Sequence, residues 1–296
     1  MINISAVIVT YNRNELLRKA LDGLLSQKVP FRNIYIIDNA SSDGTKEWCE
    51  SLVNDHIEKN ILYKRLESNC GGAGGFYFGL KAAHQDFENE WIVVLDDDAI
   101  LPADYNISLE HAIQQYPDVK CFTGNVTRME YGIKYMRIND DTEYTSVNNF
   151  SFVSAVFHRD IITKIGFPEK DYFIWYDDNE YAMRVIKNSR IVSMNRVIVE
   201  HLQNDSSMDS LLWKKYYGIR NKLHMIKKHR GKLQYHMTAV ETWIMLLGSS
   251  IIKQLVVEKS ISRYRARRKL IKDAFYDARN NRLGVRMEYM PGNHIK

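Results

Sequence analysis

The chain of 296 residues is long enough for one α/β domain and an extension, and its 45% hydrophobic and 26% charged residues are typical of a soluble globular protein. Its three widely spaced cysteines, Cys49, Cys70 and Cys121, exclude a disulfide framework and a cysteine metal site and fit a reducing cytoplasm. The net charge of +5 conceals an asymmetry, because residues 212–296 contain 20 Lys and Arg against 5 Asp and Glu, and the remaining residues 21 against 31.

The first part of the chain alternates apolar strands with helices. Apolar, mostly β-branched runs predict strands over residues 4–10, 33–38, 61–66 and 91–95. Helices are predicted between them, after Asn14, from Thr45 and over 76–85. The strand spacing of about 30 residues predicts a mainly parallel, doubly wound sheet. We expect no signal peptide, and no stretch reaches the roughly 18 to 20 apolar residues of a membrane span.

The rest of the chain continues this pattern and then changes character. Helices are predicted over about 101–115, over 160–165 and from 177, strands over 120–127, 150–157 and 191–201, and a polar loop or hairpin over 128–150. After residues 203–207 the sequence is rich in Tyr, Trp, Leu, Lys and Arg, which predicts helices over 211–230 and 238–282. We therefore expect an α/β domain over 1–207 and a basic helical region over 208–296.

Three consecutive carboxylates, Asp96, Asp97 and Asp98, follow the predicted strand over 91–95. Ligands of open α/β sheets bind at the carboxyl ends of the strands. Adjacent carboxylates repel one another unless a cation or hydrogen-bond donors share them. Hard oxygen ligands suit Mg²⁺ or Mn²⁺ and, through the metal, a diphosphate. The alternative is an acidic turn that ends the strand.

Two further features lie at neighbouring strand ends. Asp38 ends the second strand, where it can accept a hydrogen bond from a nucleobase; alternatively, it caps the strand. The run Gly71–Gly75 precedes a predicted helix, and glycine backbone N–H groups there can approach an anion. The run lacks the spacing of a dinucleotide fingerprint or a phosphate loop, so a tight strand-to-helix turn is the alternative.

Asp177 and Asp178 follow the aromatic run Tyr172–Tyr176. A carboxylate beside aromatic walls and a second carboxylate tends to have a raised pKa, as general-base catalysis needs, and Trp175 can stack on a sugar face. The alternative is a helix N-cap followed by ordinary core aromatics. His201, at the end of the last predicted strand, is a candidate third metal ligand or a structural histidine.

Together these motifs resemble the inverting GT-A glycosyltransferases of family 2 over about residues 3–205. The resemblance rests on Val7–Asn12, Ile37–Gly44, Asn69 with the glycine run, the Asp triplet, and Asp177–Tyr181 with Arg184. Within that family, the glycine run and the triple Asp look like the galactofuranosyltransferase and rhamnosyltransferase branch, and Tyr216-Tyr-x-x-Arg-Asn221 is similar to a stretch located after the catalytic domain in that branch. One departure is that many members carry Glu-Asp where this chain has Asp177-Asp178.

The resemblance implies a role for each group of residues, and with them Mn²⁺ or Mg²⁺ as cofactor. A uridine or thymidine diphosphate would be bound by Thr10, Tyr11, Arg13, Asp38, Asn69, Gly71, Gly72, Asp96 and Asp97. The metal would be held by Asp96, Asp98 and His201. Trp175 and Tyr176 would contact the acceptor, and Asp178, or its neighbour Asp177, would be the general base.

These roles imply an inverting, metal-dependent sugar transferase of bacterial surface polysaccharide synthesis, such as that of O-antigen or capsule. The expected donor is UDP-galactofuranose, and the expected acceptor is a saccharide or a lipid-linked saccharide. The alternatives are a rhamnosyltransferase that uses dTDP-rhamnose and a non-catalytic nucleotide-sugar- or glycan-binding module. A sugar-nucleotide pyrophosphorylase would need a glycine-rich loop near the first strand, which residues 9–13 do not supply.

We expect a location in the cytoplasm, and the lipid-linked acceptor that the resemblance implies would bring the protein to the inner face of the plasma membrane. The apolar stretch Thr242–Ile252 is too short to span a bilayer but can lie in its interface, and the basic run Arg263–Lys269 favours an anionic surface. The alternative is a helical subdomain that packs on the catalytic domain or forms a homo-oligomer. We expect no nucleic-acid partner, because no recognition motif is present.

Overall fold

The computed structural model describes residues 2–55, 60–130, 133–138, 141–202, 212–253 and 261–291. The chain divides into two compact units. The first contains the residues up to Lys170 and the stretch that begins at Asp178. The second contains Asp171–Asp177 and the C-terminal helices, so a short segment from the middle of the chain groups with the C-terminal region.

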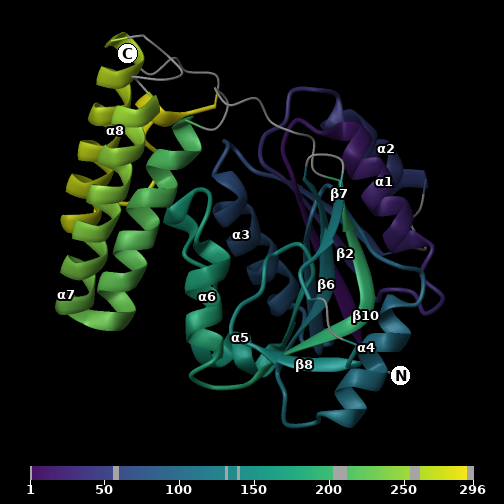
Figure 1. Ribbon diagram of the computed structural model, residues 1–296. Helices are drawn as coiled ribbons and strands as arrows, with labels where there is room; N and C mark the ends of the chain where they lie inside the picture. Colours follow the sequence, from purple (N-terminus) through teal and green to yellow (C-terminus); the bar gives the residue numbers. More distant parts are fainter. Residues whose placement is uncertain are drawn as a thin grey trace. The chain divides into compact units, whose positions relative to one another are not determined.

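The first unit is built on one mixed sheet (Figure 1). Its strand order is β3-β2-β1-β4-β9-β6-β10-β5. These strands are β1 Ile4–Thr10, β2 Ile34–Asp38, β3 Ile61–Arg65, β4 Trp91–Asp96, β5 Ala99–Ile100, β6 Cys121–Glu130, β9 Ala155–His158 and β10 Ile191–His201. The first four strands pair in parallel, whereas β9 runs antiparallel between β4 and β6. The predicted α/β fold, with a sheet of GT-A type flanked by helices, is confirmed.

Helices cover both faces of this sheet, because β1 is apolar on both sides. Ala6 and Ile8 pack in one core with α1 (Asn14–Leu25), α2 (Thr45–Asp55) and α4 (Tyr105–Gln115). Val7 and Val9 pack in the other core with α3 (Gly71–Gln85), α5 (Arg159–Ile165) and residues of α6 (Asp177–Val185). Successive residues of a strand point to opposite faces, so a strand that is buried along its whole length needs a layer on each side.

The segment over 128–150 forms the predicted hairpin in part. Strand β6 continues to Glu130 and pairs antiparallel with β7 (Ile133–Met136), and β8 (Tyr144–Val147) pairs with β10. The strand predicted over 150–157 is shorter than expected, since β9 begins only at Ala155. Phe150 and Phe152 are buried in the core ahead of it, so an apolar run there marks core packing without a strand.

The glycine run was predicted to precede a helix, and that prediction is wrong, because α3 begins at Gly71 itself. The reason is the close approach of this helix to β1. A Cβ atom at Gly75 would lie 2.3 Å from Cγ1 of Val9, and one at Gly79 would lie 2.3 Å from Cγ1 of Val7. Glycine is a poor helix former, but here tertiary packing requires the absence of a side chain.

Gly75→Ala is expected to lower the free energy of unfolding by about 1 to 3 kcal/mol, because the added methyl group overpacks the contact between α3 and Val9. Urea denaturation measures this change. Gly72→Ala is the matched control, since no atom lies within 4 Å of a Cβ at Gly72 and alanine is the better helix former. Equal stabilities of the two variants would contradict this account of the glycines.

The second unit contains the helices α7 (Leu212–Lys253) and α8 (Ile261–Arg279), the 3₁₀ turn Met287–Tyr289, and all but the first residue of the 3₁₀ turn Lys170–Tyr172. Gly231, with φ of 82° and ψ of 177°, divides α7 into arms over 212–230 and 232–253. The described parts of the stretches that were expected to be helical, 211–230 and 238–282, lie mostly in α7 and α8. Helix α7 also includes residues 231–237, which were not expected to be helical, and residues 254–260 lie outside the described residues. Among the residues that the structure describes, no helix combines the length and the apolarity that crossing a membrane requires.

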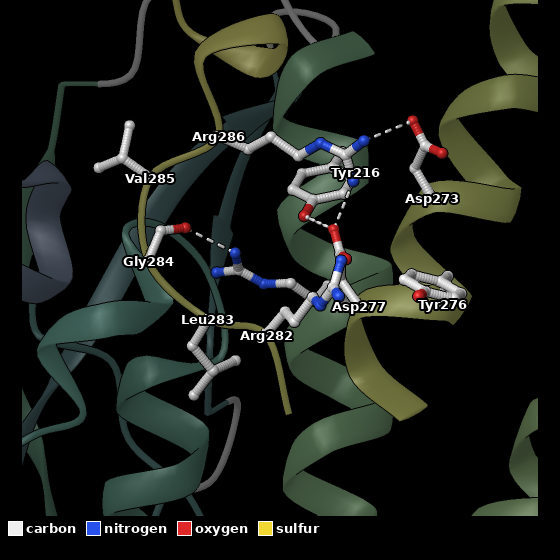
Figure 2. A pocket seen from close by; sticks show the side chains of 10 residues that line it. Tyr216, Asp273, Tyr276, Asp277, Arg282, Leu283, Gly284, Val285 and Arg286 are labelled. Carbon is white, nitrogen blue, oxygen red and sulfur yellow. Dashed lines mark hydrogen bonds and ion pairs between the residues drawn. The ribbon is translucent and has the colours of Figure 1, made fainter. Parts of the chain in front are cut away.

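The segment that follows α8 is held to the helices by Arg286 (Figure 2). Nη2 of Arg286 lies 3.1 Å from Oδ2 of Asp273, and Nη1 pairs with Asp277. Asp277 also accepts a hydrogen bond of 2.6 Å from the hydroxyl of Tyr216. These side chains line a cavity of about 500 Å³. Because its charged groups are paired with one another, we assign this network to fixing the C-terminal segment.

Candidate active site

The acidic triplet lies where β4 ends and the chain turns into β5. Strand β5 pairs antiparallel with the end of β10, with Ala99 opposite His201. The N–H of Leu202 donates to the carbonyl of Asp98 at 2.8 Å. This short ladder fixes His201 beside Asp98, although the two residues are far apart in the sequence. The convergence of these two side chains, on which the sequence prediction of a metal site depends, is therefore set by backbone pairing.

Asp96, Asp98 and His201 each offer one ligand atom, and these atoms lie within 4.8 Å of one another. Nε2 of His201 is 3.0 Å from Oδ1 of Asp98. That oxygen is buried, and no residue that the structure describes makes a hydrogen bond of good geometry to it. Opposite ligands of a divalent ion at 2.0 to 2.2 Å lie about 4.2 Å apart. The donor set and its spacing fit a divalent cation.

The charges of this cluster stabilise one another. Burial disfavours a charged imidazole, but the carboxylates of Asp98 and Asp96 outweigh it and raise the pKa of His201 above its ordinary value. Burial likewise disfavours an ionised Asp98, but His201 and Arg13 hold its pKa below the usual value. The carboxylates therefore favour positive charge at this position, and His201 would have to lose its proton to ligate a metal ion.

Asp97 joins the acidic triplet to the end of β1. Its Oδ2 accepts from the hydroxyl of Thr10 at 2.8 Å and from the N–H of Tyr11 at 3.4 Å. Nη1 of Arg13 lies 3.2 Å from Oδ1 of Asp97 and 2.9 Å from Oδ2 of Asp98. Burial raises the pKa of Asp97 to about 6, against the lowering effect of Arg13 and Thr10. Thr10, Tyr11, Arg13 and the triplet thus form one site.

Asp38 lies at the end of the neighbouring strand β2 and is fully buried. Its Oδ1 accepts from the N–H of Ser41 and its Oδ2 from the hydroxyl of Tyr63, each at 2.8 Å. Arg65 lies 3.6 Å from Oδ2. The carboxylate therefore orders the turn after β2, and a nucleobase would have to replace one of these partners to reach it. Its role in base recognition stays a prediction.

Asn69, Gly71 and Gly72 form the entry to α3. Oδ1 of Asn69 accepts from the N–H of Gly71 at 2.8 Å, and Gly71 has a φ of +71° that favours glycine. Asn39, which the sequence prediction missed, donates from Nδ2 to the carbonyl of Gly71 at 3.1 Å and accepts from the N–H of Cys70. Asn39 follows Asp38 directly, and this adjacency to a strand-end carboxylate is the signal that could have identified it.

Asp178, the second residue of α6, is half-buried in the first unit. Its Oδ1 accepts from the N–H of Asn179 at 2.7 Å and from Nδ2 of Asn179 at 2.6 Å. Asn149 donates to Oδ1 of Asn179 at 3.2 Å, and Arg137 donates to the carbonyl of Asn149. Burial raises the pKa of Asp178, whereas Asn179 and Arg137 oppose the rise. Arg137 and Asn149 were not predicted, because neither belongs to a motif.

Asp177, Trp175 and Tyr176 belong to the second unit. Phe173, Trp175 and Tyr176 have positive φ values, between 65° and 68°, which is uncommon for bulky residues. Nδ2 of Asn221 lies 2.9 to 3.0 Å from the carbonyls of Tyr172, Ile174 and Trp175. This contact holds the segment in its strained conformation.

Two further contacts secure the same segment. Nη2 of Arg220 donates to the carbonyls of Asp171 at 3.0 Å and Tyr172 at 3.1 Å. Trp175 lies against Gly218, where a Cβ would come within 2.8 Å of its ring. Tyr216-Tyr-x-x-Arg-Asn221 had no assigned role in the sequence, and its last two residues prove to be a clamp on the backbone that precedes Asp178. We call Arg220 and Asn221 the clamp.

Comparison with known proteins identifies related chains. A family model described as glycosyl transferase family 2 matches residues 5–166. Galactofuranosyltransferase GlfT1 of Mycolicibacterium smegmatis is 25% identical over 205 residues, which cover 62% of this chain and 66% of that protein. Poly-beta-1,6-N-acetyl-D-glucosamine synthase of Staphylococcus epidermidis is 25% identical over 182 residues, 57% of this chain and 42% of that protein. The chain thus spans less than two thirds of the length of either relative.

Solved structures share the fold. A mannosyltransferase from Pyrobaculum calidifontis, solved in complex with GDP-Man and Mn²⁺, has a TM-score of 0.58 at 15% identity and covers 94% of this chain and 87% of its own. Residues 1–349 of TarS from S. aureus, solved in complex with UDP-GlcNAc, have a TM-score of 0.60 at 15% identity and cover 94% of this chain and 81% of their own. At these identities the similarity shows the fold alone.

Proposed function

Because the chain belongs to glycosyl transferase family 2, whose model matches more than half of it, we propose that it transfers a sugar from a nucleotide-sugar donor to a hydroxyl of a saccharide acceptor in bacterial surface polysaccharide synthesis. The observation that carries this proposal is the site at the carboxyl ends of β1 and β4. Thr10, Arg13 and the acidic triplet meet there beside His201. A cation site with a neighbouring arginine suits the negative charge of a nucleoside diphosphate.

We propose a divalent cation, Mn²⁺ or Mg²⁺, as part of this site, held by Asp96, Asp98 and His201. When bound, such an ion would offset the negative charge that grows on the leaving diphosphate. Arg13, which now pairs with Asp97 and Asp98, adds a positive charge at the same place. Tyr11 is 37% exposed beside it, where it can cover a nucleotide.

We propose Asp178 as the general base, with Asp177 as the alternative. Asp178 would take the proton from the acceptor hydroxyl while that oxygen forms a bond to the anomeric carbon and the bond from this carbon to the diphosphate breaks. One displacement of this kind inverts the anomeric centre. The raised pKa of Asp178 supports this role, since a stronger base accepts the proton more readily. Trp175, 40% exposed, and Tyr176 are the proposed acceptor contacts.

We propose UDP-galactofuranose as the donor, supported by the relative GlfT1. The test measures release of UDP or dTDP by the full chain with Mn²⁺ and an acceptor, for UDP-galactofuranose, UDP-galactopyranose and dTDP-rhamnose in parallel. Release from the first donor alone supports the proposal, and release from dTDP-rhamnose alone would assign the rhamnosyltransferase. Thermal stabilisation by UDP and Mn²⁺ without release from any donor, in the presence of a panel of saccharide acceptors, would favour a binding module.

The pH dependence of transfer tests the environment of Asp178. A base works in its ionised form, so activity is lost as the pH falls through the pKa of Asp178, which burial has raised. Arg137 lowers this pKa through its positive charge. Arg137→Met should therefore raise the pKa further and move the acid limb of the kcat/KM profile to higher pH. Arg190→Met, which removes an exposed arginine paired with Asp118, is the control. An unmoved acid limb in Arg137→Met would contradict the assignment.

A further inference from the structure

The second arm of α7 exposes a line of apolar side chains. It consists of Leu233, Met237, Val240 and Ile244, which are between 58% and 78% exposed. Intervals of three and four residues place them on one face of the helix, over about 16 Å. The opposite face is buried at Tyr235, Thr238 and Thr242. Single exposed apolar residues are common, but a continuous line of four along one helix marks an interaction surface.

Helix α8 exposes a row of cations. It consists of Arg265, Arg268, Lys269, Lys272 and Arg279, all of them exposed. Their spacing again places them on one face, opposite the buried residues Leu270, Ala274 and Ala278. Lys269 pairs with Glu288 at 2.7 Å, which leaves the row strongly positive.

The apolar line and the cationic row lie on the same side of the second unit. The second arm of α7 and α8 run antiparallel. The charge of Arg279, at the end of α8, opposes the rise in the pKa of Tyr235, near the start of the arm. Trp243, further along the arm, contacts Phe275, which comes earlier in α8. Ile244 follows Trp243, and Tyr276 follows Phe275. When two right-handed helices run antiparallel and contact each other, the residue that follows the contact in each helix points to the same side of the pair.

We propose that this face docks the protein on a lipid bilayer that contains anionic headgroups. The apolar line of α7 would enter the boundary between headgroups and acyl chains, and the cationic row of α8 would contact the lipid phosphates. The choice of occupant follows from charge complementarity, since an apolar strip flanked by cations matches an anionic membrane surface. The proposal rests on exposure and charge in the second unit and does not depend on the identity of the sugar donor.

Co-sedimentation of the full chain with vesicles tests this docking. Binding is expected to vesicles of phosphatidylcholine with phosphatidylglycerol, to weaken as salt is added, and to be weak on phosphatidylcholine alone. Arg268→Glu with Lys272→Glu should lower the partition coefficient by at least about 25-fold, since each cation at an anionic surface contributes about fivefold. Ile244→Glu should lower it by about tenfold or more.

Matched variants in the first unit control for surface chemistry. Phe87→Glu replaces an aromatic side chain that is 83% exposed, and Lys19→Glu with Lys164→Glu reverses two exposed cations. Neither should change vesicle binding. Equal binding to neutral and anionic vesicles would overturn the proposal. So would vesicle binding that Ile244→Glu leaves unchanged, because the apolar line would then not enter the membrane. A dimer that Ile244→Glu dissociates, without vesicle binding, would assign the face to a second copy of the chain.

Discussion

Asp178→Asn is expected to lower the turnover number by about 10² to 10⁴, the usual contribution of a general base, while the affinity for the donor stays within about twofold. The substitution removes the charge and the proton acceptor but keeps an oxygen that can accept from Asn179. The fold should therefore be preserved. The measurements are kcat for sugar transfer and the dissociation constant of the nucleotide sugar, each for the wild type and the variant.

Asp177→Asn separates the two carboxylates that the sequence left as alternatives. Asp177 lies in the second unit, and Asp178 in the first. If Asp178 is the base, Asp177→Asn should retain most of the turnover. If instead Asp178→Asn transfers sugar at the wild-type rate and Asp177→Asn does not, the roles are exchanged. Wild-type turnover in both variants would show that neither Asp177 nor Asp178 is the general base.

Asp98→Asn is expected to lower turnover by about 10² to 10³, the scale seen when one group that stabilises developing charge is removed. It should also weaken Mn²⁺ binding, because the substitution neutralises a buried carboxylate 3.0 Å from His201 and 2.9 Å from Arg13. Titration with Mn²⁺, followed by electron paramagnetic resonance in the presence of UDP, measures the affinity. Asp118→Asn, which neutralises an exposed carboxylate, is the control.

Removal of the metal from the wild-type protein gives an independent measurement. Treatment with EDTA should abolish transfer, and added Mn²⁺ or Mg²⁺ should restore it. Full activity after EDTA treatment, or Mn²⁺ binding that Asp98→Asn leaves unchanged, would show that Asp98 serves only to pair with Arg13 and His201.

The fold could be predicted from the sequence where hydrophobic pattern decides it. The strands β1, β2 and β4 are apolar runs buried on both faces, and such runs have few alternatives. The start of α3 could not be predicted in this way. Glycine disfavours a helix by its intrinsic propensity, and the close contact with β1 that requires glycine at Gly75 and Gly79 is not visible in the sequence.

The candidate site also has a part that the sequence predicts and a part that it does not. The meeting of Asp98 with His201 followed from a shared sheet edge and needed only the ladder between β5 and β10. Arg137 and Asn149 escaped prediction, because they lie in a polar stretch without periodicity and reach Asp178 through contacts that no local pattern encodes. Arg220 and Asn221 were visible as a pattern, but their function is to bind main-chain carbonyls about 50 positions earlier, which a sequence motif does not reveal.

The clamp makes the conformation of the segment Asp171–Asp177 depend on the C-terminal helices. The chain leaves the first unit after Lys170, makes a seven-residue excursion, and re-enters at Asp178. Left-handed residues in that excursion cost about 1 to 3 kcal/mol each and persist only where their surroundings impose them. Those surroundings are side chains of α7. Exchanging the C-terminal helices between relatives would thus also exchange the conformation of the aromatic stretch ahead of Asp178, unless the incoming helix supplied an Arg-Asn pair at the same two positions.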